Sequence, residues 1–144
     1  MNMATRNLIN GKICDQIEIY DRALHYGDGL FETIAIQDKK IICYDEHVNR
    51  LEQGCKKLNI PIPDKVSLKN EIFSLIDSSD QAVIKIIISR GQGGRGYKIP
   101  TNIEPTSIIS LFSWPNYPNE NSTAGIKTRV CDYRYSKNIA LAGI

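Results

Sequence analysis

A chain of 144 residues with 42% hydrophobic and 24% charged content has enough apolar material for the core of one globular domain. Its formal net charge of +2 is too small to indicate nucleic acid or an anionic membrane surface as a partner. The four cysteines form no CxxC pair and only two histidines accompany them, so no metal site is expected. Without a long apolar run or a signal peptide pattern, we expect a cytoplasmic protein with reduced thiols.

The first part of the chain predicts two antiparallel hairpins. Residues 8–13 form a short strand pattern interrupted by Asn10-Gly11, a dipeptide typical of two-residue hairpin turns. After a bend at residues 26–29, residues 30–36 have a strand pattern, and the chain returns as residues 41–43. Two hairpins in succession indicate a sheet that begins antiparallel.

Two amphipathic helices are expected next. Apolar residues recur at three- and four-residue steps from Val48 to Leu58, and Asp45 is the expected N-cap of this first helix. Pro61 and Pro63 mark its end. The second helix ends near residues 77–80 and has one apolar face, made of Leu68, Ile72, Leu75 and Ile76.

The remaining segments complete an α+β fold class. Residues 82–88 are nearly all apolar and β-branched, which predicts a strand covered on both faces, with residues 107–112 as its partner. Residues 114–122 are rich in Pro and Asn and read as a linker. We therefore expect a small N-terminal domain over residues 1–113, with an antiparallel-rich sheet and two helices. Residues 123–144 would begin a second, larger, cofactor-binding domain, with a strand from residue 127 to 131.

The glycine-rich loop at residues 90–97 is the first candidate site, with Arg90, Arg95 and Tyr97 among four glycines. Glycines let the backbone approach a ligand closely, and an arginine fork binds a carboxylate or phosphate through two hydrogen bonds. One alternative is a solvated loop with its charges pointing outward. Another is an RNA-binding fragment, which a single occurrence in a nearly neutral chain argues against.

Arg50 is the second candidate. It lies at the margin of the apolar face of the first predicted helix, about 100° from Leu51, and can reach a pocket at the helix edge. The alternative is an exposed ion pair with Glu46, four residues earlier. The spacing alone favours that pair.

The third candidate is the segment 21–33, where Gly27 and Gly29 mark a tight turn into a strand. Asp28 between them can cap the turn. A lone His25 near a turn is more often structural than catalytic. From the residues alone, this segment supports no chemical assignment.

Taken together, these segments resemble the class-IV aminotransferase family of pyridoxal-phosphate enzymes, also called fold-type IV. Four segments carry the resemblance in the same order, namely residues 9–11, 21–33, 47–51 and 90–97. Two segments, one of them this last loop, are similar to the aminodeoxychorismate lyase branch of the family. They are Ser-Arg-Gly-Gln-Gly-Gly-Arg-Gly-Tyr at residues 89–97 and Leu-Ala-Gly-Ile at residues 141–144.

The resemblance implies a cofactor and roles for four residues. The cofactor is pyridoxal 5'-phosphate, with Arg50 binding its phosphate. Phe31, Arg95 and Tyr97 would bind a small substrate that carries carboxylates, the last two across the interface of a homodimer. No catalytic residue is expected within residues 1–144, because the cofactor lysine would follow Ile144 immediately.

The implied activity is the elimination of pyruvate from 4-amino-4-deoxychorismate, which gives 4-aminobenzoate for folate synthesis. One alternative is a D-amino-acid or branched-chain aminotransferase of the same fold. Phe31 argues against the D-amino-acid type, which tends to have tyrosine at this position. Another alternative is a truncated, non-catalytic relative or binding module. No nucleic acid or membrane partner is expected.

Overall fold

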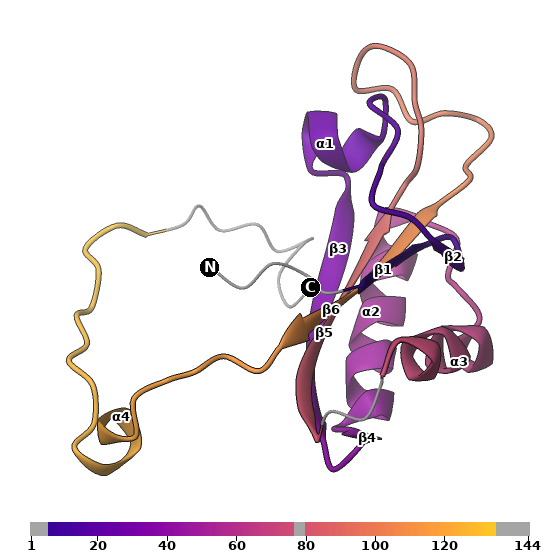
Figure 1. Cartoon of the computed structure of the whole chain (residues 1–144). Coiled ribbons are helices and arrows are strands. Elements are labelled where there is room, and N and C mark those ends of the chain that lie inside the picture. Colours follow the sequence, from indigo (N-terminus) through magenta and orange to yellow (C-terminus); the bar gives the residue numbers. More distant parts are fainter. Residues whose placement is uncertain (1–5, 77–79, 135–144) are drawn as a thin grey trace.

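The computed structural model of the chain, shown in Figure 1, describes residues 6–76 and 80–134. The Leu-Ala-Gly-Ile segment at residues 141–144 lies outside them. The elements in chain order are β1 (Arg6–Ile9), β2 (Lys12–Ile13), α1 (Arg22–Tyr26), β3 (Gly29–Gln37), β4 (Lys40–Ile41), α2 (Tyr44–Leu58), α3 (Lys65–Leu75), β5 (Gln81–Ser89), β6 (Thr106–Ser113) and α4 (Glu120–Thr123).

The six strands form one antiparallel sheet in the order β2-β1-β6-β5-β3-β4. β5 pairs along its length with β3 on one side and with β6 on the other. Both predicted hairpins are confirmed. Asn10 and Gly11 join β1 to β2, and Asp38 and Lys39 join β3 to β4, all four with positive φ. Positive φ at both turn residues matches the twist of the flanking strands, which explains the two-residue turns.

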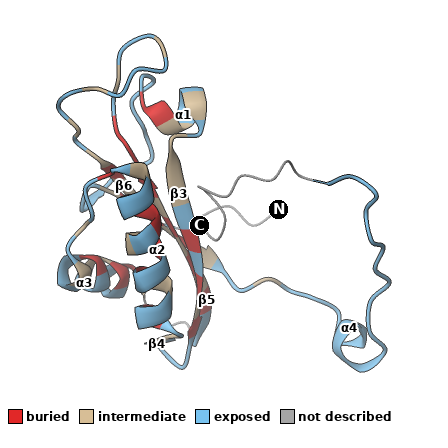
Figure 2. Ribbon diagram, turned by 180° about the vertical axis from the view of Figure 1, so that it is seen from behind, coloured by how far each residue is buried: buried red, intermediate tan, exposed pale blue. Residues whose placement is uncertain are grey.

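Helices α2 and α3 pack on one face of the sheet, as Figures 1 and 2 show. Along β5, Ile84, Ile86 and Ile88 are completely buried beneath this helical layer, while the alternate residues between them are only half buried. The prediction that this strand is covered on both faces is therefore wrong for the described part of the chain. The core joins these isoleucines to buried side chains of the helices and neighbouring strands, among them Leu8, Ile34, Ile36, Val48, Leu51, Cys55, Leu68, Ile72, Ile109 and Leu111.

The helix boundaries differ from the predicted ones in two ways. α2 begins one residue before Asp45, and its N-cap is Cys43 in the left-handed conformation. The prediction of Asp45 as N-cap is wrong; its carboxylate lies in the first turn, where it still suits the helix dipole. The short helix α1 was not predicted, although Asp21 caps its start and Gly27 ends it with φ 64°.

Beyond β6 the chain leaves the sheet. Residues 114–134 are nearly all exposed and include only the four-residue helix α4. The strand predicted at residues 127–131 does not form. The domain boundaries at residues 113 and 122 remain predictions. None of the described helices is long and apolar enough to cross a membrane.

We expect Ile86→Ala to lower the free energy of unfolding by about 2–5 kcal/mol, because it empties a completely buried position under the helices. Ile87→Ala removes the same atoms from the half-buried face and should cost less. Urea unfolding of both variants measures the difference. Equal losses would contradict the placement of the core on the helix-covered face alone.

Candidate functional site

A pocket of about 270 Å³ lies between helix α2 and strand β3. Among the described strands, β4 pairs only with the last two residues of β3, so the first part of β3 has an open edge beside the helix. Two of the predicted site residues, Phe31 and Arg50, line this pocket together. The full lining is Leu30, Phe31, Glu32, Thr33, Arg50, Leu51 and Gly54.

Arg50 is held in the pocket by a carboxylate that faces the helix. Its Nε donates to Glu32 Oε1 at 2.7 Å, and its Nη2 donates to Glu32 Oε2 at 2.5 Å. This is the two-bond fork geometry that fixes a guanidinium in orientation. The expected alternative, an ion pair of Arg50 with Glu46, is not formed in the described part of the chain.

Glu32 is almost completely buried, with 6% of its side chain exposed. Burial alone would raise its pKa, but the hydrogen bonds from Arg50 and His47 outweigh burial and hold the pKa below its ordinary value. The carboxylate therefore accepts from His47 Nδ1, 2.7 Å away. Because Nδ1 is then a donor, its 3.2 Å approach to Arg50 Nη2 is a contact between two donors rather than a hydrogen bond.

The residues of this pocket fit the phosphate of the implied cofactor. The side chain of Arg50 is 54% exposed, and its Nη1 has no hydrogen-bond partner among the described residues. Gly54, one turn later on α2, adds no side chain to the pocket. Glu32 binds Nε and Nη2 of Arg50, so Nη1 can donate to an anion in the pocket.

Phe31 lies on the opposite face of β3 from Glu32 and is 62% exposed. The ammonium of Lys85, which pairs with Thr33 and so lies diagonally across from Phe31 on β5, is 4.7 Å from the ring centroid. Phe31 thus brings an aromatic ring to the border of the pocket, and the ring in turn contacts a cation.

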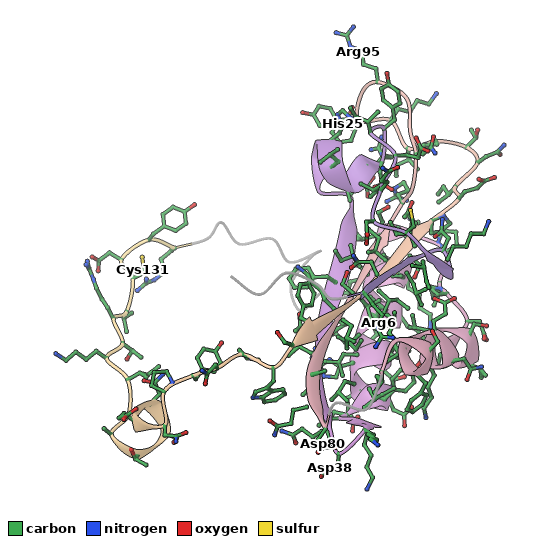
Figure 3. All side chains as sticks on the ribbon, viewed as in Figure 1. Arg6, His25, Asp38, Asp80, Arg95 and Cys131 are labelled. Carbon is green, nitrogen blue, oxygen red and sulfur yellow. The ribbon has the colours of Figure 1, made fainter. Side chains whose placement is uncertain are left out.

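Arg95 and Tyr97 lie elsewhere, in the loop that follows β5. Figure 3 shows Arg95 at the far end of the molecule, with its side chain pointing outward. Arg95 lines a second pocket of about 250 Å³ formed with helix α1. Within one chain, Arg50 and Arg95 therefore do not share a pocket, and their predicted convergence across two subunits remains a prediction.

Arg90 is not available to a ligand, although the sequence offered it beside Arg95. Its side chain is 3% exposed. Nε and Nη2 donate to Asp28; Nη2 also donates to the carbonyl oxygen of Leu58, and Nη1 donates to that of Asn59, at the end of α2. The sequence predicted that Arg90 either binds an anion together with Arg95 or points into solvent. Both predictions are wrong for Arg90.

Asp28 has a larger role than capping a turn. It accepts from Arg90 and also from Arg22 Nε at 2.7 Å, so that one carboxylate lies between two buried guanidinium groups. Burial alone would raise the pKa of Asp28, but the hydrogen bonds from the two arginines hold it below the ordinary value. His25 Nε2 lies 2.7 Å from the carbonyl oxygen of Ile19.

Glu32 and Asp28 were not identified as site residues from the sequence. For Glu32 a signal was present: alternate residues of the strand pattern place it on the same face as the apolar Ile34 and Ile36. A carboxylate on a core-facing position requires a partner of opposite charge. Asp28 lies in a turn, where no periodicity shows the direction of its side chain.

Known proteins match most of the sequence. A sequence model described as amino-transferase class IV matches residues 29–143. The chain belongs to this family. An aminodeoxychorismate lyase of Vibrio harveyi is 36% identical over 136 residues, 94% of this chain and 50% of that protein. A D-alanine aminotransferase of Bacillus licheniformis is 23% identical over 133 residues, 87% of this chain and 46% of that protein.

Solved structures of the family have the same fold. A 4-amino-4-deoxychorismate lyase from Pseudomonas aeruginosa superposes with a TM-score of 0.75 at 35% identity, over 83% of this chain and 44% of that chain. A branched-chain amino acid aminotransferase from Escherichia coli gives 0.71 at 25% identity, over 78% and 42%. The resemblance and the α+β fold class are thus confirmed. The chain spans about half the length of the relatives it matches.

We expect Asp28→Asn to lower the free energy of unfolding at neutral pH by about 3 kcal/mol or more, because two buried guanidinium groups lose their carboxylate. A carboxyl with a lowered folded pKa stabilises fully above its unfolded pKa near 3.8, and the contribution disappears as pH falls through the folded value. The gap between wild type and variant in denaturant unfolding should therefore shrink as the pH falls below 3.8. A gap that stays constant in acid would argue against this role.

Proposed function

We propose that the complete protein is a pyridoxal-phosphate-dependent aminodeoxychorismate lyase. The observation that carries the proposal is the 36% identity to a lyase over 94% of the chain, together with 35% identity to a solved lyase structure. The aminotransferases cited above are only 23% and 25% identical. The reaction would release pyruvate and leave 4-aminobenzoate, used for folate synthesis in the cytoplasm.

Arg50 would hold the cofactor phosphate at the 270 Å³ pocket. A planar, permanently charged fork suits a phosphate dianion, and Glu32 keeps that fork in one orientation. When bound, the cofactor would supply an electron-accepting ring to the reaction. Phe31, exposed at the border of the same pocket, would contact the substrate.

Arg95 and Tyr97 would bind the carboxylates of the substrate from the second subunit of a homodimer. Support comes from the distribution of the charges. Arg95 is exposed and lines a pocket without Arg50, so one chain alone does not bring the two arginines to one pocket. In such a homodimer, the loop of each subunit would add the guanidinium of Arg95 and the phenol of Tyr97 to the Arg50 pocket of the other subunit.

We expect the full-length protein with its cofactor to release pyruvate from 4-amino-4-deoxychorismate without any keto acid present. The atoms of the substrate divide completely between pyruvate and 4-aminobenzoate, so no amino-group acceptor is needed. Coupled lactate dehydrogenase and chromatography of 4-aminobenzoate measure the two products. Turnover that requires a keto-acid acceptor would show an aminotransferase instead.

Arg50→Ala should weaken cofactor retention at least about tenfold, because the phosphate loses a charge-assisted, fixed donor. Lys56→Ala is a suitable control, since Lys56 is an exposed cation on the same helix and does not line the pocket. Absorbance of bound cofactor after dialysis measures retention. If both variants retain the cofactor equally, Arg50 does not bind the phosphate.

A further inference from the structure

Arg22 connects helix α1 to the loop that carries Arg95 and Tyr97. Its side chain is buried, with 4% exposed, and Nε donates to Asp28 at 2.7 Å. Its terminal nitrogens donate to the carbonyl oxygens of three consecutive loop residues. The distances are 3.2 Å to Gly96, 3.4 Å to Tyr97 and 3.5 Å to Lys98.

The loop has little other support. Residues 93–100 contain no helix or strand. Among the described residues, the only other hydrogen bonds to residues 93–98 are from Gly93 N to the Tyr20 carbonyl, 3.1 Å, and from Gly96 N to the Tyr26 phenol oxygen, 3.0 Å. The Arg22 guanidinium also stacks 4.7 Å from the Tyr26 ring centroid. Side chains of α1 therefore hold the second half of the loop.

Helix α1 is itself fixed to the sheet. Asp21, its N-cap, is completely buried. One oxygen of its carboxylate accepts from Ser89 Oγ at 2.8 Å and from Thr106 Oγ1 at 2.7 Å, at the adjoining ends of β5 and β6. Arg22 therefore extends from a rigid base, which is the condition for holding another group accurately.

This arrangement fixes the loop backbone and leaves the side chains of Arg95 and Tyr97 exposed, with the Tyr97 ring centroid 5.3 Å from that of Tyr26. Tyr97 is 85% exposed, and Arg95 has no ion pair among the described residues. We propose that Arg22 is a positioning residue: it fixes residues 93–98 and through them presents Arg95 and Tyr97 to the carboxylates of the substrate. The proposal rests on the proposed function for the identity of that substrate, but not for the anchoring of the loop.

Only an arginine meets these demands. Its planar fork offers five N–H donors, enough for one carboxylate and three carbonyl oxygens at once. A lysine ammonium is a single point with three donors, so it cannot reach Asp28 and the loop carbonyls together. Arg22→Lys therefore keeps the charge and removes the hydrogen bonds to the loop carbonyl groups.

Trypsin digestion of the full-length protein tests the anchoring without any need for activity, because Arg95 and Lys98 are trypsin sites. We expect Arg22→Lys to speed cleavage at these two sites about tenfold, as the loop opens more often. Ile86→Val is the control for lowered core stability and should not speed cleavage there selectively. Unchanged cleavage at Arg95 and Lys98, or equal acceleration in both variants, would overturn the proposal.

Gly93→Ala provides a second variant in case Arg22→Lys folds poorly. A Cβ at this position would lie 2.8 Å from Cδ and 2.9 Å from Cγ of Arg22, so the loop and the arginine stem must move apart. The same selective cleavage is expected. Its absence would overturn the proposal.

Steady-state kinetics then separate positioning from a merely structural role. Arg22→Lys should raise KM for 4-amino-4-deoxychorismate about tenfold while kcat changes less than about threefold and cofactor retention stays normal. In an Arg95→Gln background the same change should add little, because the two residues act as one unit. Additive effects would overturn the proposal. If wild type releases no pyruvate, the proposed function fails, and the trypsin result alone decides the anchoring.

Discussion

The carboxylate of Asp28 lies between two buried guanidinium groups, and the turn before β3, helix α1 and the glycine-rich loop all depend on it. Arg90 extends this ion cluster to the last carbonyl groups of α2, which a helix leaves without partners of its own. Arg22 extends it to the loop. One short acidic side chain thereby joins three segments that are distant in sequence, namely residues 22–28, the end of α2 and the glycine-rich loop. Removing it would leave two charges buried without compensation.

Much of the fold could be predicted because its determinants are local. Asn10-Gly11 specifies a hairpin, and the spacing of apolar residues specifies α2 and α3. Helix α1 could not be found in this way, because five residues are too short to show a period. The sequence also could not predict that only one face of β5 is covered, because a run of β-branched residues fits a strand covered on one face or on both.

The candidate site shows a sharper limit. Spacing along the helix favoured Glu46 as the partner of Arg50, yet the partner is Glu32, which is distant in sequence and lies on a strand. The resemblance to the family selected Arg50, and only the three-dimensional arrangement supplied its partner. Arg90 and Arg95 look equivalent in the sequence, but the side chain of Arg90 is buried and that of Arg95 is exposed. No local pattern distinguishes them, because burial is a tertiary property.

The open edge of β3 has a consequence for the behaviour of the protein in concentrated solution. A strand with unpaired backbone groups is a template on which another molecule can add a strand. Glu32 places a charge that points inward on this edge strand, one of the devices by which natural sheets discourage such addition. The carboxylate that holds Arg50 in one orientation therefore also places a charge on the open edge of the sheet.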